Sequence, residues 1–425
     1  MACVTRWLAL LTALLAIEQA AAATDCDNDG KVVLAKGSKN SEAIVYGVSC
    51  NETTLTVDSK SKLTASGFKI EEIKSIPDVV DLNLALNSLS AIPKFADAEA
   101  LTKLTLTSNK FTSFKDLNVP ANLKTLDLSW NSIESFSDMS LPSTLTDLYV
   151  GGNKFTSLSG SFPNTLKLLY VHDLPLQASL SDATLSDSIA FLSLVNSGLT
   201  TLDSDKLPKN LTSLDVSKNS LTVLPAQYPE PLLTLIGSGN KLTELSNIIF
   251  PRTMTTLNLS SNAITKVSGV LFPWSLTTLD LGSATITQIE LCRSDFTTFS
   301  RLKAFSASIE VSSSCSNGAE KMTFGSTTVC VLSDDAFNAL YNSSVSSSSS
   351  GSAGPSASTS GTASDKDGSS SLSVVLIIVI CVAAVLAIAL AVVGTRTYRA
   401  KMNKQQTFVD TGFFANNTQL GSTGH

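Results

Sequence analysis

The chain contains few residues that are able to perform acid–base or metal chemistry. Its two histidines are His172 and His425, so a metal site built from several histidines cannot form. Asp173 follows His172, and Ser193 lies further along the chain; these are the three residue types of many hydrolase triads. No nucleophile elbow or oxyanion loop accompanies them. The sequence therefore predicts a protein that is not an enzyme and that uses no cofactor or metal.

A second group of residues favours binding instead of catalysis. Exposed aromatic side chains on a rigid scaffold provide a large contact area at a small entropic cost, and they are typical of binding hot spots. The candidate ligand-binding residues combine such rings with polar side chains and are Trp130, Asp147, Tyr149, Leu168, Tyr170, His172, Asp173 and Phe191. The alternative is that irregular stretches of the chain bury some of these rings in the core.

These candidates belong to a repeat that organises most of the chain. The pattern L-x-x-L-x-L-x-x-N fits Leu101, Leu104, Leu106 and Asn109, and it recurs along the sequence. Each unit contributes one short strand whose alternating leucines are buried only when neighbouring units stack. Eleven units are readable, and their closing positions are Asn87, Asn109, Asn131, Asn153, Leu174, Ser197, Asn219, Asn240, Asn262, Ala284 and Ala307.

The repeat also predicts what each position does. The asparagine amide can pair with backbone groups that a turn would otherwise leave buried and unpaired. Proline in Phe162-Pro163, Phe250-Pro251 and Phe272-Pro273 forbids a long helix, and the phenylalanines can fill the convex layer. The candidate binding residues take outward strand positions in the fourth to sixth units, with Trp130 in the third. Tyr149, Tyr170 and Phe191 are thus predicted to form a continuous stripe with Trp130.

These repeats resemble those of the leucine-rich-repeat family. The layout of residues 26–394 resembles the ectodomain and transmembrane span of the receptor-like proteins and receptor-like kinases of that family. The resemblance implies an α/β solenoid, a horseshoe with a parallel concave sheet and short turns on its convex side, plus one transmembrane helix. It also implies cysteine-bearing caps and a concave face that binds an extracellular protein, peptide or glycan. Residues 395–425 are far fewer than a kinase domain needs and lack its motifs, so a membrane co-receptor or kinase is expected to report binding.

Two apolar segments predict a membrane anchor. Residues 1–23 combine Arg6, an apolar run and a small-residue cleavage site, as in a signal peptide. An uncharged apolar run is long enough to span a bilayer, and basic residues follow it, which predicts a type I plasma-membrane protein with an extracellular N-terminus. The predicted segments are 1–23 signal peptide, 24–78 N-terminal cap, 79–310 repeat solenoid, 311–342 C-terminal cap, 343–371 Ser/Gly-rich stalk, 372–394 transmembrane helix and 395–425 cytoplasmic tail.

Cysteines and sequons predict modifications of the extracellular part. Cys26 and Cys50 flank the N-terminal cap and are predicted to form a disulfide. Cys292 and Cys315 occupy the same phase in adjacent units, which favours a Cys292–Cys315 disulfide, with Cys315–Cys330 as the open alternative. N-glycosylation is predicted at Asn51, Asn210, Asn258 and Asn342. A glycan on Asn258 would screen one end of the concave face.

The sequence as a whole predicts a cell-surface, receptor-like binding protein without catalytic activity. A net charge of -6 and a pI of about 5.1 argue against a nucleic-acid partner. One alternative is a structural or adhesion protein of the cell surface. Another is a receptor kinase of the tyrosine-kinase-like group whose kinase domain is lost or missing from the coding sequence.

Overall fold

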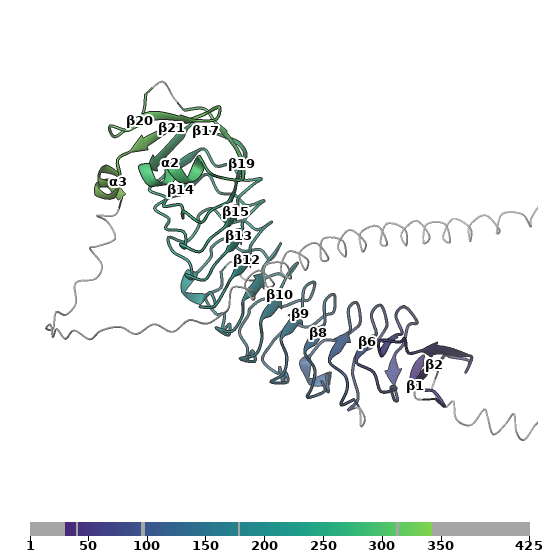
Figure 1. The fold of residues 1–425 in the computed structure, drawn as a ribbon. Coiled ribbons are helices and arrows are strands. Elements are labelled where there is room, and N and C mark those ends of the chain that lie inside the picture. Colours follow the sequence, from purple (N-terminus) through teal and green to yellow (C-terminus); the bar gives the residue numbers. More distant parts are fainter. Residues whose placement is uncertain (1–29, 40, 95–97, 177–178, 312–313, 342–425) are drawn as a thin grey trace, which may run out of the picture. The chain divides into compact units, whose positions relative to one another are not determined.

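The computed structural model describes residues 30–39, 41–94, 98–176, 179–311 and 314–341 (Figure 1). These residues belong to one compact unit, Met1–Ser350, and a second unit, Gly351–His425, lies outside the described residues. Within the described ranges, no helix is long and apolar enough to cross a membrane. The predicted signal peptide, stalk, transmembrane helix and cytoplasmic tail all lie outside these ranges and remain predictions.

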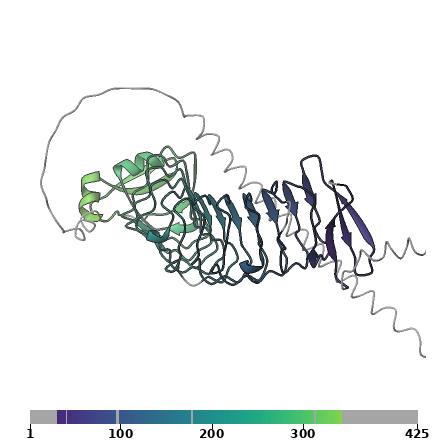
Figure 2. The same ribbon diagram turned by 90° about the horizontal axis from the view of Figure 1, so that it is seen from below.

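Short strands, one in each repeat, form a single parallel sheet that runs the length of the repeats (Figures 1 and 2). Its strands are β4 (Lys62–Thr64), β6 (Asp81–Asn83), β7 (Lys103–Thr105), β8 (Thr125–Asp127), β9 (Asp147–Tyr149), β10 (Leu168–Tyr170), β11 (Phe191–Ser193), β12 (Ser213–Asp215), β13 (Thr234–Ile236), β15 (Thr256–Asn258), β17 (Thr278–Ile286) and β19 (Ala304–Ile309). The strands from β6 onward are those of the eleven predicted units. β4 adds a strand inside the segment predicted as the N-terminal cap.

The leucines of neighbouring strands lie in register and build the core. Leu126, Leu148 and Leu169 are direct partners across β8, β9 and β10, and all three are completely buried. Side chains alternate along a strand, so the residues on either side of each leucine face away from the core. The predicted solenoid of stacked parallel strands is therefore present, and each unit depends on its neighbours for burial.

The repeated asparagine pairs with backbone groups of its turn, as predicted, and it also joins adjacent units. Asn153 Nδ2 donates hydrogen bonds to the carbonyl oxygens of Leu128 (3.0 Å) and Val150 (2.8 Å), and its Oδ1 accepts one from the amide of Ile133 (3.0 Å). Corresponding bonds are made by Asn87, Asn109, Asn131, Asn219, Asn240 and Asn262. At the irregular position Ser197, the shorter hydroxyl donates to the carbonyl of Val171 (3.0 Å). We call this row of side chains the asparagine ladder.

A second row of hydrogen bonds, which the sequence did not predict, lies where the chain enters several of the strands. Thr144 Oγ1 donates to the carbonyls of Ala121 (2.7 Å) and Leu123 (2.8 Å) in the preceding unit. Thr165 and Ser275 make equivalent pairs of bonds. Each of these hydroxyl residues lies two positions after a proline in the sequence. The Pro-x-Ser/Thr sequence thus provides a turn and a tie to the previous unit.

The side of the units away from the twelve-stranded sheet contains short turns, as predicted, but the last units use strands there. Phe250 and Phe272 are buried in this layer with ring centroids 5.8 Å apart, which confirms their predicted role. The short helices are η1 (Phe114–Asp116), η2 (Ser204–Lys206) and α2 (Arg293–Phe299). A second sheet has the strand order β14 (Glu244–Ser246), β16 (Lys266–Ser268), β18 (Gln288–Cys292), β21 (Thr327–Leu332) and β20 (Glu320–Phe324).

The N-terminal region forms a small separate sheet. Its strand order is β3 (Glu52–Thr56), β2 (Glu42–Tyr46), β1 (Val33–Lys36) and β5 (Glu72–Ile73). Cys50 is disulfide-bonded. Cys26 lies outside the described residues, so the Cys26–Cys50 pair stays a prediction.

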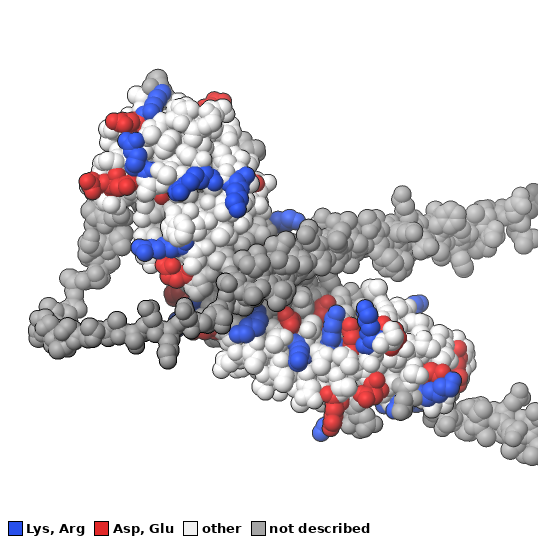
Figure 3. All heavy atoms as spheres, in the orientation of Figure 1, with Lys and Arg blue, Asp and Glu red and all other residues white. Residues whose placement is uncertain are grey.

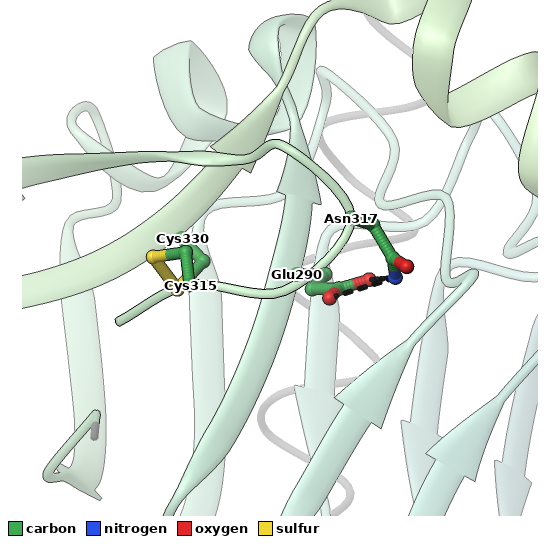
Figure 4. The surroundings of a disulfide bond; sticks show 4 residues. All are labelled: Glu290, Cys315, Asn317 and Cys330. Atoms are coloured by element: carbon green, nitrogen blue, oxygen red, sulfur yellow. Dashed lines mark hydrogen bonds between the residues drawn. A yellow bond between two sulfur atoms is a disulfide. The ribbon is translucent and has the colours of Figure 1, made fainter. Parts of the chain in front are cut away.

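The cysteine pairing at the C-terminal end differs from the favoured prediction. Cys315 and Cys330 form a disulfide with a Cα–Cα distance of 5.6 Å (Figure 4). Cys292 is a buried free thiol. The Cys292–Cys315 prediction was wrong because it assumed that the repeat continues unchanged after Ala307. Instead, β21 returns beside β18 and places Leu332, not Cys315, opposite Cys292. The end of the sheet is followed by α3 (Asp334–Tyr341).

Candidate functional site

Strands β9, β10 and β11 place the candidate binding residues on the outer face of the twelve-stranded sheet, the face turned away from the core. Asp147 and Tyr149 flank the buried Leu148, and Leu168 and Tyr170 flank the buried Leu169 in the same way. Phe191 begins β11. These outward side chains are half-buried, so the units do not repack them into the core. The sheet therefore presents them at fixed positions on an accessible face.

Five rings contact one another on this face, and we call them the aromatic cluster: Trp130, Tyr149, Tyr170, His172 and Phe191. Tyr170 lies at its centre, with ring-centroid distances of 5.8 Å to Tyr149, 6.2 Å to Phe191 and 5.0 Å to His172. His172 in turn lies 6.0 Å from Trp130, which is 43% exposed. Such edge and stacked contacts between rings are favourable beyond simple burial.

The arrangement of the rings differs in detail from the predicted stripe. Tyr149 and Tyr170 are direct partners in the strand register. Phe191 is instead the partner of Leu168, and Ser193 is the partner of Tyr170. The Phe191 ring reaches Tyr170 diagonally, and Trp130 is connected to the other rings through His172. The rings are contiguous, but they form a broad patch and not a single line.

Two glycines that the sequence analysis did not single out make room for the cluster. A Cβ atom added to Gly152 would lie 2.5 Å from Cε3 of Trp130, and one added to Gly151 would overlap the His172 ring. Gly152 also has a φ of +67°, a conformation that glycine adopts at little cost. The Gly-Gly pair directly before Asn153 was the available signal, because the corresponding pair in each of the other units contains at least one residue with a side chain.

His172 and Asp173 interact with each other, but they do not form a triad with Ser193. His172 Nδ1 lies 2.8 Å from Asp173 Oδ2, and Asn196 Nδ2 donates to the other carboxylate oxygen. Burial tends to raise the pKa of Asp173, but the hydrogen bonds from Asn196 and His172 outweigh it and lower the pKa. Ser193 is only 1% exposed, and among the described residues it makes no hydrogen bond to His172. The pair orients the imidazole within the aromatic cluster.

Carboxylates surround the two tyrosines. Asp127 is the direct register partner of Tyr149, and Asp147 lies on the same strand as Tyr149. Burial, followed by the charges of Asp147 and Asp127, raises the pKa of Tyr149 to about 12. Burial and then the charge of Asp215 raise the pKa of Tyr170. Both phenols are therefore neutral at physiological pH and lie in a region of negative potential.

A separate groove of about 480 Å³ lies on the second sheet, beside the C-terminal disulfide. Both carboxylate oxygens of Glu290 on β18 accept hydrogen bonds from Asn317 Nδ2 (3.1 Å each) (Figure 4). Glu290 also accepts one from the Tyr341 hydroxyl. These bonds fasten the C-terminal segment to the sheet.

On the face of the molecule drawn in Figure 3, acidic and basic side chains are interspersed.

The predicted glycosylation sites differ in their surroundings. Asn51 and Asn210 are exposed. Asn258 is half-buried on β15, where its Oδ1 accepts hydrogen bonds from the amide (3.0 Å) and hydroxyl (2.7 Å) of Ser260. Asn342 lies outside the described residues. Glycosylation at these four positions remains a prediction.

Comparison with known proteins bears on the fold. The family model described as leucine-rich repeat matches residues 119–135 and 250–272. Comparison with curated proteins gives no match. Among solved structures, the chain is similar to YopM from Yersinia pestis, with 22% identity, a TM-score of 0.41 and coverage of 60% of this chain and 81% of that chain. It is also similar to the internalin InlF from Listeria monocytogenes, with 20% identity, a TM-score of 0.39 and coverage of 61% and 85%.

YopM from Yersinia enterocolitica has 20% identity and a TM-score of 0.34, and the match covers 59% of this chain. The chain spans 65% of the length of that protein. These structural similarities are too low to bear on function. The matched segments coincide with stacked units that contain a short parallel strand and the conserved spacing of leucines. The two matched segments therefore combine the sequence pattern of a leucine-rich repeat with the strand arrangement of stacked units.

Proposed function

We propose that this chain is a cell-surface, receptor-like protein that binds an extracellular protein or peptide through the aromatic cluster and catalyses no reaction. The observation that supports this function best is the contact of five half-exposed rings on one face of a parallel sheet. Large aromatic side chains contribute strongly to protein interfaces when they are held in place before binding. The cluster has this property because strands and a Gly-Gly turn fix its rings.

The scaffold beneath the cluster is well suited to such a role. Asn131 and Asn153, both buried, tie the units that hold Trp130 and Tyr149 to the units before them. Tyr170 is held by the pairing of β10 with β9 and β11. The sheet therefore loses little conformational freedom when a partner binds. A rigid outer face with exposed rings and short connections favours recognition of a macromolecule over enclosure of a small substrate.

The proposed location depends on segments outside the described residues. A signal peptide at 1–23 and a span at 372–394 would place the repeats outside the cell and residues 395–425 in the cytosol. We also propose that a membrane co-receptor or kinase relays binding to the cell interior.

Site-directed photo-crosslinking tests the proposed binding face. A photo-reactive amino acid replaces Leu168, which lies between Asp147 and Phe191 in the strand register beside the cluster, or Thr278, a half-buried outer-face residue of β17, in the full chain. We expect irradiation of expressing tissue to give a discrete adduct with an extracellular protein from position 168 and none from position 278. No adduct, or the same adducts from both positions, would contradict the proposed site.

A further inference from the structure

We propose that the segment of the partner that lies on the aromatic cluster is extended and basic, with an arginine or lysine whose charged group rests on the rings between Asp127 and Asp215. This inference rests on the proposed function and specifies the chemistry of the partner. It follows from the positions of the carboxylates in the sheet, from the lack of cations paired with them and from the electron-rich faces of the rings.

The strand register places the carboxylates on both sides of the tyrosines. Across β8 to β12, one row of outward residues reads Asp127, Tyr149, Tyr170, Ser193 and Asp215, each being the direct partner of the next. Adjacent strands lie about 4.8 Å apart, so the two carboxylates are separated by roughly 19 Å. An extended segment of about six residues spans this distance.

A third carboxylate lies in the neighbouring row. Asp147 is the partner of Leu168, which is itself the partner of Phe191. Asp147 Oδ2 accepts a hydrogen bond from Thr146 Oγ1 (2.7 Å). The rings are therefore bordered by negative charge in both rows.

The chain neutralises a comparable carboxylate elsewhere on this face but not these three. Asp81 on β6 lies 3.8 Å from Lys62 Nζ and 3.7 Å from Lys103 Nζ. Among the described residues, no lysine or arginine nitrogen lies within 4.0 Å of Asp127, Asp147 or Asp215. The nearby Lys218 acts on Asp173 and Asp215 only through its field. A cation supplied by a partner would neutralise these carboxylates, as Lys62 and Lys103 do for Asp81.

The rings add a second attraction for the same group. The faces of tyrosine, tryptophan and phenylalanine rings carry partial negative charge and attract ammonium and guanidinium groups. The ring planes of Tyr170 and Phe191 are nearly parallel, with an interplanar angle of 2°, and both rings are half-exposed. A planar guanidinium stacks on such a pair and can still pair with a carboxylate at either end of the row. An acidic or purely apolar segment would gain neither interaction.

The chain supplies the variants that separate charge from structure. Asp127 Oδ1 and Asp215 Oδ1 each accept a hydrogen bond from an amide two residues on (2.9 Å). In two other units an asparagine makes the same local bond, Asn83 to Ala85 and Asn258 to Ser260 (3.0 Å each). The double substitution Asp127→Asn/Asp215→Asn therefore removes the charges and keeps the local bond. Asp280→Asn is the matched control, because Asp280 makes this bond to Gly282 (3.0 Å) outside the cluster.

The experiment selects displayed random dodecapeptides on the purified full-length protein. We expect the peptides recovered on the parent and on Asp280→Asn to be enriched in arginine and lysine relative to the starting library. The best of these peptides should bind Asp127→Asn/Asp215→Asn roughly tenfold more weakly, and its affinity should fall as salt is raised. Recovery of peptides without this enrichment, failure to recover peptides, or undiminished binding to the double variant would overturn the inference.

A third variant separates this inference from the proposed function. Tyr149→Ala/Tyr170→Ala removes the rings and keeps the carboxylates. If the parent selects peptides that are not basic and this ring variant does not bind them, the aromatic cluster is the binding site and only the inference about charge fails. If the ring variant selects the same basic peptides as the parent, both the proposed function and the inference fail.

Discussion

Single asparagines have a large influence on the stability of this protein because each one satisfies backbone groups of two units. Asn153 is 6% exposed and makes its hydrogen bonds in a region without access to solvent. A buried backbone amide or carbonyl without a partner costs about 1–3 kcal/mol. The same geometry explains why asparagine recurs and why Ser197, with a shorter side chain, marks an irregular unit.

Replacing Asn153 by alanine should therefore destabilise the protein markedly. We expect the free energy of unfolding, measured by urea titration, to fall by about 2 kcal/mol or more, because the Ile133 amide and the Val150 carbonyl lose a partner. Asn164→Ala, at an exposed position, is the control and should change it by less than about 0.5 kcal/mol. Equal effects of the two substitutions would show that the asparagine ladder contributes nothing specific.

Asp295 is a buried carboxyl group with an unusual protonation equilibrium. It lies in α2, is 3% exposed and accepts a hydrogen bond from the amide of Phe272 (3.1 Å). Burial raises its pKa to about 7, although the bonds from Phe272 and Cys292 oppose this change. The ordinary value is 3.8, so between these two pH values the folded protein binds more protons than the unfolded chain.

The consequence is a specific pH dependence of stability. Because the folded-state pKa is raised, the contribution of Asp295 to the free energy of unfolding decreases as pH rises from about 4 to about 7 and is constant above that range. We expect Asp295→Asn to remove this decrease. At pH 8 the free energy of unfolding of the variant should exceed that of the parent by up to roughly 4 kcal/mol, since each pKa unit corresponds to about 1.4 kcal/mol. Parallel stability profiles of parent and variant over this pH range would contradict this account.

At the scale of secondary-structure elements, the turn after β9 determines where the aromatic rings lie. Gly152 and Gly239 occupy the same position in their units, directly before the asparagine, with φ of +67° and +68°. They differ in surroundings. A Cβ atom on Gly152 would collide with Trp130, whereas the nearest atom to one on Gly239 is 3.6 Å away, at ordinary contact distance.

This pair of glycines separates backbone strain from displacement of a ring. Gly239→Ala should lower the free energy of unfolding by about 1 kcal/mol through strain alone. Gly152→Ala should lower it by at least about 1 kcal/mol more and shift the fluorescence of Trp130, since the indole must move. The contacts of Trp130 with Gly152 would be unimportant if the two variants had the same stability and the same emission spectrum.

The sequence was sufficient to predict the elements that repeat, but not those that break the repeat. Spacing alone located the strand leucines, the asparagine ladder and the outward position of Tyr149 and Tyr170, because each is fixed by local periodicity. The Cys315–Cys330 disulfide was not favoured, since the return of β21 beside β18 depends on packing at the end of the solenoid. Asp127 and Asp215 were not distinguished from other polar residues, because their relation to the tyrosines appears only in the strand register.

At the scale of the whole molecule, stacked units give a rigid face, and the predicted anchor determines which compartment that face meets. The basic residues after 372–394 predict that the repeats are extracellular. Protease added to intact cells should remove an epitope tag inserted near Thr24 and spare one at His425. Protection of both tags would contradict the type I topology and with it the extracellular location of the partner.

The aromatic cluster is the central feature of this account, and truncating its two tyrosines tests it most directly. The measurement is the affinity of Tyr149→Ala/Tyr170→Ala for the extracellular protein cross-linked from position 168, with Thr256→Ala/Thr278→Ala as the control on the same sheet. We expect the tyrosine variant to lose at least about 2 kcal/mol of binding free energy and the threonine variant to lose little. Thermal melting of each variant distinguishes lost contacts from lost folding. A tyrosine variant that melts like the parent and binds this protein with unchanged affinity would show that the binding site lies elsewhere.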